Sequence, residues 1–165
     1  AVAPLFVIHT FIIIGCVFGD IDWSTREIAQ QWFDDFALKF GEIVKSGDSL
    51  SNLMIDYADN VIDCNSMRCY DNKQELIKDL DIAFKLLASF DAYFDIKIWS
   101  KKQVQSMVLY IHQGINGQTL VFRASLLSKL NDNGQISHWI YTADEMMLQQ
   151  ADKFWKELNN LKPEL

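Results

Sequence analysis

The hydrophobic pattern of this chain changes period near residue 90, and this change constrains the fold more than any other feature. Before residue 90 apolar side chains recur at helical spacing, and Ile28, Trp32 and Phe36 belong to one such stripe. Over residues 92–142 they alternate instead, as they do on the pleated surface of strands. Helices followed by a run of strands predict an α+β domain with a mostly antiparallel sheet.

The expected elements are bounded by residues that favour helix ends and turns. Ser24, with Glu27 in the capping-box position, is expected to begin the first helix, and Gly47 to end it. Asp71, with Gln74 three residues later, is expected to cap the third helix. We expect helices over residues 24–47, 49–57, 71–90 and 143–161, and strands over residues 61–65, 68–70, 92–100, 103–115, 119–130 and 135–142.

Length and composition are those of one ordinary globular domain. The chain has 165 residues, enough for a hydrophobic core without crosslinks, and half of them are apolar. Its formal net charge is -7, and its 15 Lys and Arg residues are scattered. A nucleic-acid surface needs clustered basic residues, so we expect no nucleic-acid partner. We also expect no cofactor and no metal, because neither a glycine-rich phosphate loop nor a metal motif occurs.

The first 19 residues carry no charge and include a dense apolar run over residues 11–18. This run is short for a membrane span, which needs about 20 apolar residues. Val17 and Gly19 are small residues at the two positions that a signal peptidase reads. We therefore expect residues 1–19 to be a signal peptide, residues 20–165 to be the secreted domain, and no membrane span to remain. A membrane anchor and a buried N-terminal helix or strand are the alternatives.

Two cysteines remain once Cys16 in the expected leader is set aside. Cys64 and Cys69 lie on either side of the expected short strand pair. Neighbouring strands bring Cα atoms close enough for a disulfide, and disulfides persist in secreted proteins. We expect this bridge, with two free buried thiols as the alternative. A zinc site is not expected, because no His is near the pair and two thiolates supply only half a site.

Two segments resemble the nuclear transport factor 2-like superfamily, in particular its SnoaL-like and ketosteroid-isomerase-like members. Tyr57-Ala58-Asp59-Asn60 is similar to the "Y-A-D-D" that precedes a pocket-lining strand, a short hairpin and a helix in those proteins. Asn133-Gly134-Gln135-Ile136, followed by an aromatic strand and Asp144, is similar to their "D-G-K-I" ending. The resemblance covers about residues 25–145. It implies a single cone-shaped domain whose curved sheet carries three helices on its concave side, plus a C-terminal helix.

The same resemblance indicates which residues would carry chemistry, and at three positions this chain departs from the catalytic residues of the family. Asn65 falls on the general-base Asp of the ketosteroid isomerases, Phe40 on their Tyr, and Leu126 near their oxyanion-hole Asp. An amide cannot take a proton from carbon, so steroid isomerase activity is not expected. Asp63 shares a strand face with Asn65 and is the candidate base, because burial would raise its pKa. A solvated or hydrogen-bonded edge residue is the alternative.

The dehydratases of the superfamily use paired His residues with Tyr and Asp inside the cone. By this resemblance the candidate catalytic residues are Asp63, Tyr110, His112 and His138. Each His has a structural or surface role as its alternative. The candidate ligand-binding residues are Phe40, Tyr57, Asn65, Trp99, Leu126 and Trp139.

Two functions follow as hypotheses. The first is a secreted protein that binds a small apolar molecule in an aromatic pocket, with or without catalysis of the isomerase, dehydratase or cyclase type. The second is a non-catalytic module that dimerises or binds a partner through the sheet. A homodimer is expected because large apolar groups occupy both strand faces and a monomer rarely exposes a large apolar patch. Burial of the outer face by the C-terminal helix is the alternative.

Overall fold

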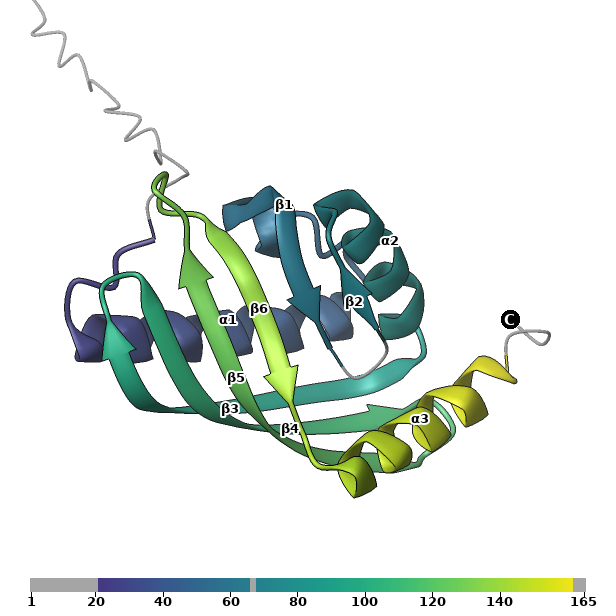
Figure 1. Ribbon diagram of the computed structural model, residues 1–165. Helices are drawn as coiled ribbons and strands as arrows, with labels where there is room; N and C mark the ends of the chain where they lie inside the picture. The colour runs from purple at the N-terminus through teal and green to yellow at the C-terminus, as the bar shows by residue number, and fades with distance from the viewer. Residues whose placement is uncertain (1–20, 66–67, 162–165) are drawn as a thin grey trace, which may run out of the picture.

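The computed structural model describes residues 21–65 and 68–161, and the predicted leader over residues 1–19 lies outside this range. Figure 1 shows one curved sheet with the helices gathered on its concave side. The predicted α+β class is confirmed. The elements are α1 (Arg26–Ser46), the 3₁₀ helix η1 (Leu53–Asp56), β1 (Tyr57–Cys64), β2 (Cys69–Tyr70), α2 (Lys73–Phe84), β3 (Leu87–Ser100), β4 (Gln103–Gly114), β5 (Thr119–Leu130), β6 (Ile136–Thr142) and α3 (Glu145–Asn159).

The sheet has six strands in the order β2-β1-β6-β5-β4-β3. Strands β3 to β6 follow one another as antiparallel neighbours, and β1 joins the sheet parallel to β6. On the long strands every second residue is buried, as on β5, where Leu120, Phe122 and Ala124 face the core. The alternation read from the sequence therefore corresponds to a sheet with one face against the core and one face outward.

Helix α1 begins and ends for local reasons. Thr25 caps it, since the Thr25 hydroxyl accepts a hydrogen bond from the Ile28 amide at 3.2 Å. Ser24, the predicted cap, lies one residue earlier. Gly47 ends the helix as predicted, in the left-handed conformation with φ 73°, and its amide donates to the Ile43 carbonyl at 2.9 Å.

Side chains of α1 shield the edge strand β3. The side chain of Gln30 donates to the Phe94 carbonyl at 2.8 Å and accepts from the Ile96 amide at 3.3 Å. Arg26 donates to the Ile96 carbonyl. A Cβ atom added at Gly41 would lie 2.8 Å from the Phe90 carbonyl oxygen, so only glycine allows this approach. The edge is thus covered by a helix, which blocks pairing with another strand there.

Two predicted helices differ in the structure. The segment expected to be helical over residues 49–57 contains only the short η1, and Tyr57 already belongs to β1. Helix α2 is capped by Asn72 rather than Asp71, since the Asn72 side chain accepts from the Gln74 and Glu75 amides at 2.9 and 3.1 Å. It ends at Phe84 instead of residue 90, because β3 begins at Leu87 and pairs with β4 along its whole length.

The C-terminal helix α3 packs on the concave side. Its buried residues include Phe154, Trp155 and Leu158, and a Cβ atom added at Gly114 on the inner face of β4 would meet the Leu158 side chain at 2.6 Å. The alternative in which α3 covers the outer face of the sheet is therefore wrong. No helix among the described residues is long and apolar enough to span a membrane.

A disulfide joins Cys64 of β1 to Cys69 of β2, as the sequence predicts. The two cysteines are opposite each other in the antiparallel register, which brings their side chains together. The bridge fixes the end of β1 next to Asp63, the candidate base. Within the described residues, no group of three or more His, Cys, Asp and Glu side chains is placed to hold a metal ion.

Candidate functional site: an aromatic cavity with buried polar groups

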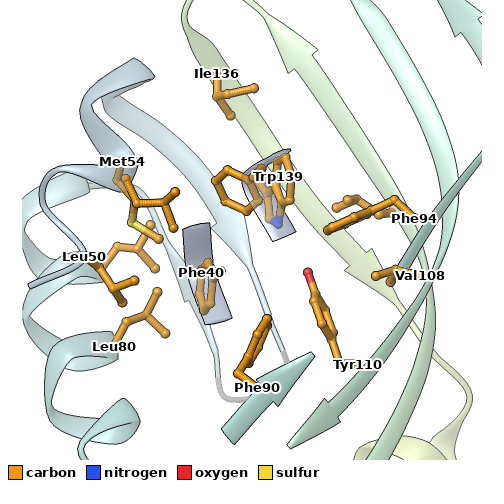
Figure 2. Packing of buried hydrophobic residues seen from close by; sticks show 14 of the residues in the cluster. Phe40, Leu50, Met54, Leu80, Phe90, Phe94, Val108, Tyr110, Ile136 and Trp139 are labelled. Atoms are coloured by element: carbon orange, nitrogen blue, oxygen red, sulfur yellow. The ribbon is translucent and has the colours of Figure 1, made fainter. Parts of the chain in front are cut away.

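The concave face of the sheet meets the helices through aromatic side chains. Trp139 on β6 is 3% exposed, and its ring centroid lies 5.2 Å from that of Phe36, 5.6 Å from that of Phe33 and 6.0 Å from that of Tyr57. Figure 2 shows the hydroxyl of Tyr110 pointing toward Trp139. These centroid distances are typical of aromatic rings packed in stacked or tilted pairs.

A cavity of about 70 Å³ lies within this cluster. Its wall comes from the concave sheet face and from all of the helices, so it lies where a ligand can be enclosed. Most of the wall is aromatic. The lining residues are Phe36, Phe40, Met54, Tyr57, Asp63, Asn65, Leu80, Phe84, Phe90, Tyr110, His112, Phe122, Trp139, Tyr141 and Trp155.

Asp63 is a carboxyl buried in this wall. It lies on β1 and is 3% exposed. Burial raises the pKa of Asp63 to about 8, and the hydrogen bond that the Asn65 side chain donates to it at 3.3 Å opposes this rise. The described lining residues include no Lys or Arg that could stabilise the charged form. Near pH 7 Asp63 is therefore mostly protonated, and its hydroxyl can donate a hydrogen bond.

Tyrosine hydroxyls and an indole form a second polar group in the wall. The Trp139 indole donates to the Tyr141 hydroxyl at 2.7 Å, and the Tyr141 and Tyr110 hydroxyls are hydrogen bonded to each other. Burial, together with the negative charge of ionised Asp63, raises the pKa values of Tyr57 and Tyr110 well above the ordinary range. These hydroxyls stay protonated and can serve as hydrogen-bond donors.

His112 lies on β4, two residues from Tyr110 on the same strand face, and is 6% exposed. Its ring stacks on Phe90 at 4.8 Å between centroids and lies 5.7 Å from the Trp155 ring of α3. Neither ring nitrogen has a hydrogen-bond partner within residues 21–65 and 68–161. Burial lowers the pKa of His112 to about 3, so the imidazole is neutral at physiological pH.

The structure brings together most of the residues selected from the sequence. Three of the four candidate catalytic residues, Asp63, Tyr110 and His112, line the cavity. Of the candidate ligand-binding residues, Phe40, Tyr57, Asn65 and Trp139 line it as well.

Three selected residues lie elsewhere. His138 precedes the inward-facing Trp139, so the alternation of β6 turns it to the other face, where its Nδ1 atom lies 3.0 Å from the Ser137 hydroxyl. Trp99 follows the register shift between Ile96 and Ile98 in β3, and its indole donates to the Trp23 carbonyl at 3.1 Å. Leu126 is fully buried in the core.

Two polar residues of the cavity were missed by the sequence reasoning. Tyr141 follows Trp139 by two residues on β6, and this period-2 spacing is a signal that could have selected it. Trp155 lies on α3, which was considered only as a possible cover for the outer face. No local signal places a C-terminal helix against β4, because that contact depends on the packing of distant segments.

At the level of sequence, the chain matches no protein-family model and no curated protein. Solved structures, in contrast, share its fold. A Δ5-3-ketosteroid isomerase from Mycobacterium sp. has a TM-score of 0.56 at 14% identity, and the match covers 68% of this chain and 93% of the isomerase. An NTF2-like protein of unknown function from Exiguobacterium sp. 255-15 has a TM-score of 0.54 at 9% identity, over 67% of this chain and 98% of that one.

A third structure was solved with a ligand. The protein RV0760c from Mycobacterium tuberculosis, in complex with estradiol-17β-hemisuccinate, has a TM-score of 0.53 at 13% identity, and the match covers 68% of this chain and 96% of that protein. Identities this low carry information on fold and not on activity. The TM-scores between 0.53 and 0.56 show that the fold is shared over about two thirds of this chain. The chain has the cone-shaped fold of the nuclear transport factor 2-like superfamily.

Proposed function

We propose that this protein binds a small, uncharged, apolar molecule in the cavity and holds one of its oxygen atoms by hydrogen bonds from Asp63 and the tyrosine hydroxyls. The observation that carries the proposal is a buried carboxyl, 3% exposed and with a pKa of about 8, in an otherwise mostly aromatic wall. A neutral carboxyl and phenols are donors, which suit a carbonyl or hydroxyl oxygen. The apolar steroid ring system of the ligand bound to the related fold supports a ligand with apolar rings.

A charged ligand fits the cavity poorly. Transfer of a charge from water into an apolar site costs free energy unless an opposite charge meets it. His112 is neutral at physiological pH, and the described wall holds no Lys or Arg, so an anion finds no partner. The aromatic rings instead offer contact area to an apolar ring system.

Catalysis by proton transfer is the extension of this proposal. A group with a pKa near the working pH can both take up and return a proton, and Asp63 meets that condition. The ionised carboxylate would remove a proton from the carbon next to a ketone, and the hydroxyls of Tyr110 and Tyr141 would stabilise the enolate oxygen. The protonated Asp63 would then return the proton, which is chemistry of the isomerase, dehydratase or cyclase type. Exchange of the C1 protons of 2-tetralone in D₂O, followed by NMR with wild-type protein and Asp63→Asn, tests this step.

The affinity for 2-tetralone is expected to depend on pH through Asp63. This two-ring ketone accepts a hydrogen bond from the protonated carboxyl, and the ionised carboxylate cannot donate one. Its dissociation constant, measured by isothermal titration calorimetry, should therefore rise by up to about tenfold per pH unit above pH 8 and stay level below it.

Two controls isolate the role of Asp63. Tetralin has the same rings without the oxygen. It should bind more weakly, and its dissociation constant should not rise above pH 8. Asp63→Asn keeps a donor that does not titrate, so 2-tetralone should bind this variant with no change above pH 8. Equal pH profiles for 2-tetralone and tetralin would contradict the proposed role of Asp63, and absence of binding by both would contradict the proposed function.

We further propose that the protein is secreted and works as a homodimer. The disulfide between Cys64 and Cys69 supports secretion, because such bridges persist in oxidising compartments. The outer sheet face supports the dimer, since the described helices pack on the other face. Its exposed apolar residues include Tyr93 (59%), Met107 (46%) and Val121 (43%), with the half-buried Leu109 and Ile111 between them.

Met107→Lys is expected to weaken this dimer. Its lysine ammonium would have to lose water on an apolar interface, which should raise the dimer dissociation constant at least tenfold, by about 1.4 kcal/mol. Multi-angle light scattering at micromolar concentration should give the mass of two chains for the wild-type protein and a lower mass for the variant. Met146→Lys, at a 60% exposed position on α3, is the matched control and should remain dimeric. A wild-type mass of one chain would refute the dimer.

A further inference from the structure

Two side chains at the α3 end of the cavity carry polar atoms without a hydrogen-bond partner among the described residues. The Nδ1 and Nε2 atoms of His112 and the Nε1 atom of Trp155 are buried, and none has a hydrogen-bond partner in the described part of the chain. Both side chains are 6% exposed, both line the cavity, and their ring centroids lie 5.7 Å apart. Buried polar atoms without partners destabilise a fold, so their convergence at a cavity indicates a role in ligand binding.

This pair lies apart from Asp63 in the sheet. Asp63 is on β1 and His112 is on β4, and the strands β6 and β5 lie between them. Three steps between strands correspond to about 14 Å along the sheet surface. Phe122, on the intervening β5, is an apolar part of the wall between them. The cavity thus carries Asp63 at one end and the pair of His112 and Trp155 at the other, and its wall between them holds Phe122 and the Tyr141 hydroxyl of β6.

The chemistry of the pair selects one kind of group. A neutral imidazole offers one acceptor and one donor nitrogen, and an indole offers only a donor. A hydroxyl can donate to the imidazole and accept from the indole at the same time, whereas a ketone or an ether can only accept. A charged group is disfavoured, because the neutral imidazole provides no opposite charge and the described wall has no other basic side chain.

We propose that His112 and Trp155 form a second polar subsite, which binds a hydroxyl group of the ligand at the end of the cavity opposite Asp63. The inference rests on the proposed function, since it assigns the far end of the same ligand. It narrows the ligand class to a compact apolar molecule with an oxygen at each end, of which the one near α3 is a hydroxyl.

Three ketones that differ at one position test this subsite. Calorimetry would compare 2-tetralone, 6-hydroxy-2-tetralone and 6-methoxy-2-tetralone at pH 6.5, where Asp63 is protonated. One buried hydrogen-bonded hydroxyl should make the 6-hydroxy compound bind about tenfold more tightly than the parent. The 6-methoxy compound, which cannot donate to the imidazole, should show no such gain.

Variants test whether the gain in affinity from the 6-hydroxyl group depends on the His112 and Trp155 side chains. Trp155→Phe keeps a large ring and removes the indole donor, and His112→Leu removes both nitrogens. Each should bring the ratio of the parent and 6-hydroxy dissociation constants close to one. Trp23→Phe is the matched control, since the Trp23 Nε1 atom is also buried without a partner within the described residues but lies outside the cavity. This control should keep the full tenfold ratio.

The outcomes separate the subsite from the proposed function. A parent ketone that binds, with no gain for the 6-hydroxy compound or with the gain kept in both variants, overturns the subsite alone. If no ketone binds, the proposed function fails, and phenol then tests the subsite by itself. A phenol-induced shift of the Trp155 indole N–H resonance that is lost in His112→Leu supports the subsite, and the lack of such a shift overturns it.

Discussion

Asp63→Asn is expected to be more stable than the wild-type protein at pH 8, and its stability should not fall between pH 6.5 and 8. The folded state raises the pKa of Asp63 from 3.8 to about 8 through burial. Between these values the folded protein holds a proton that the unfolded chain has lost, so stability falls as pH rises, by about 1.4 kcal/mol per pH unit. The contribution of protonated Asp63 is complete below pH 3.8 and is lost as the pH passes 8.

His112 acts in the opposite direction at lower pH. Burial lowers its pKa from 6.5 to about 3, so between these values the unfolded chain binds the extra proton and stability rises with pH. The slopes of the free energy of unfolding against pH from the two groups cancel between about pH 4 and 6.5. From pH 6.5 to 8 only Asp63 changes this free energy. We therefore expect the free energy of unfolding of the wild-type protein to stay level up to pH 6.5 and then to fall by about 2 kcal/mol up to pH 8 through these two groups.

Unfolding in guanidinium chloride, followed by tryptophan fluorescence at a series of pH values, measures these profiles. In Asp63→Asn the free energy of unfolding should rise with pH up to pH 6.5, because only His112 then contributes. The fall above pH 6.5 should be absent. Asp59→Asn is the matched control, because Asp59 is on the same strand with its side chain 98% exposed. A lower stability of Asp63→Asn than of the wild-type protein at pH 8 would contradict the assignment.

Trp139→Ala is expected to lower the free energy of unfolding by about 3 to 5 kcal/mol, the range for removal of a fully packed aromatic side chain. Trp139 is 3% exposed and contacts the rings of Phe33, Phe36 and Tyr57, which belong to α1 and β1. Its removal therefore takes contacts from both of these elements at once. It also leaves the Tyr141 hydroxyl without its indole donor.

The same unfolding experiment at pH 6 measures this loss, with Trp99→Ala for comparison. Trp99 is only partly buried and lies outside the cavity wall, so its removal should cost distinctly less. Trp139→Phe should fall between the wild-type protein and Trp139→Ala, because a smaller ring keeps part of the packing. Equal losses for Trp139→Ala and Trp99→Ala would show that Trp139 is not the centre of the aromatic cluster.

Several features of the fold follow from local sequence. Alternation along β4 and β5 assigns Tyr110 and His112 to one strand face, because successive side chains of a strand point to opposite sides. Gly47 ends α1 because the left-handed conformation favours glycine. Cys64 and Cys69 lie close enough in sequence that a short strand pair brings them together.

The boundary between α2 and β3 shows where local signals fail. Residues 84–90 have apolar side chains that fit both periods, and the segment pairs with β4 only in the folded sheet. Local signals also fail to explain Gly41, because helix propensity favours alanine at this position. Only the approach of α1 to the Phe90 carbonyl accounts for glycine at this position.

The sequence by itself determined the types of most elements, the faces of the long strands and the disulfide, because each depends on backbone geometry over a few residues. Only the tertiary structure decided that Asp63, His112 and Trp155 line one cavity, and that His138, Trp99 and Leu126 do not. These three lining residues come from β1, β4 and α3, which meet only when the sheet curves and the helices pack on its concave face. Curvature and packing of this kind depend on contacts between distant parts of the chain, which no local period encodes.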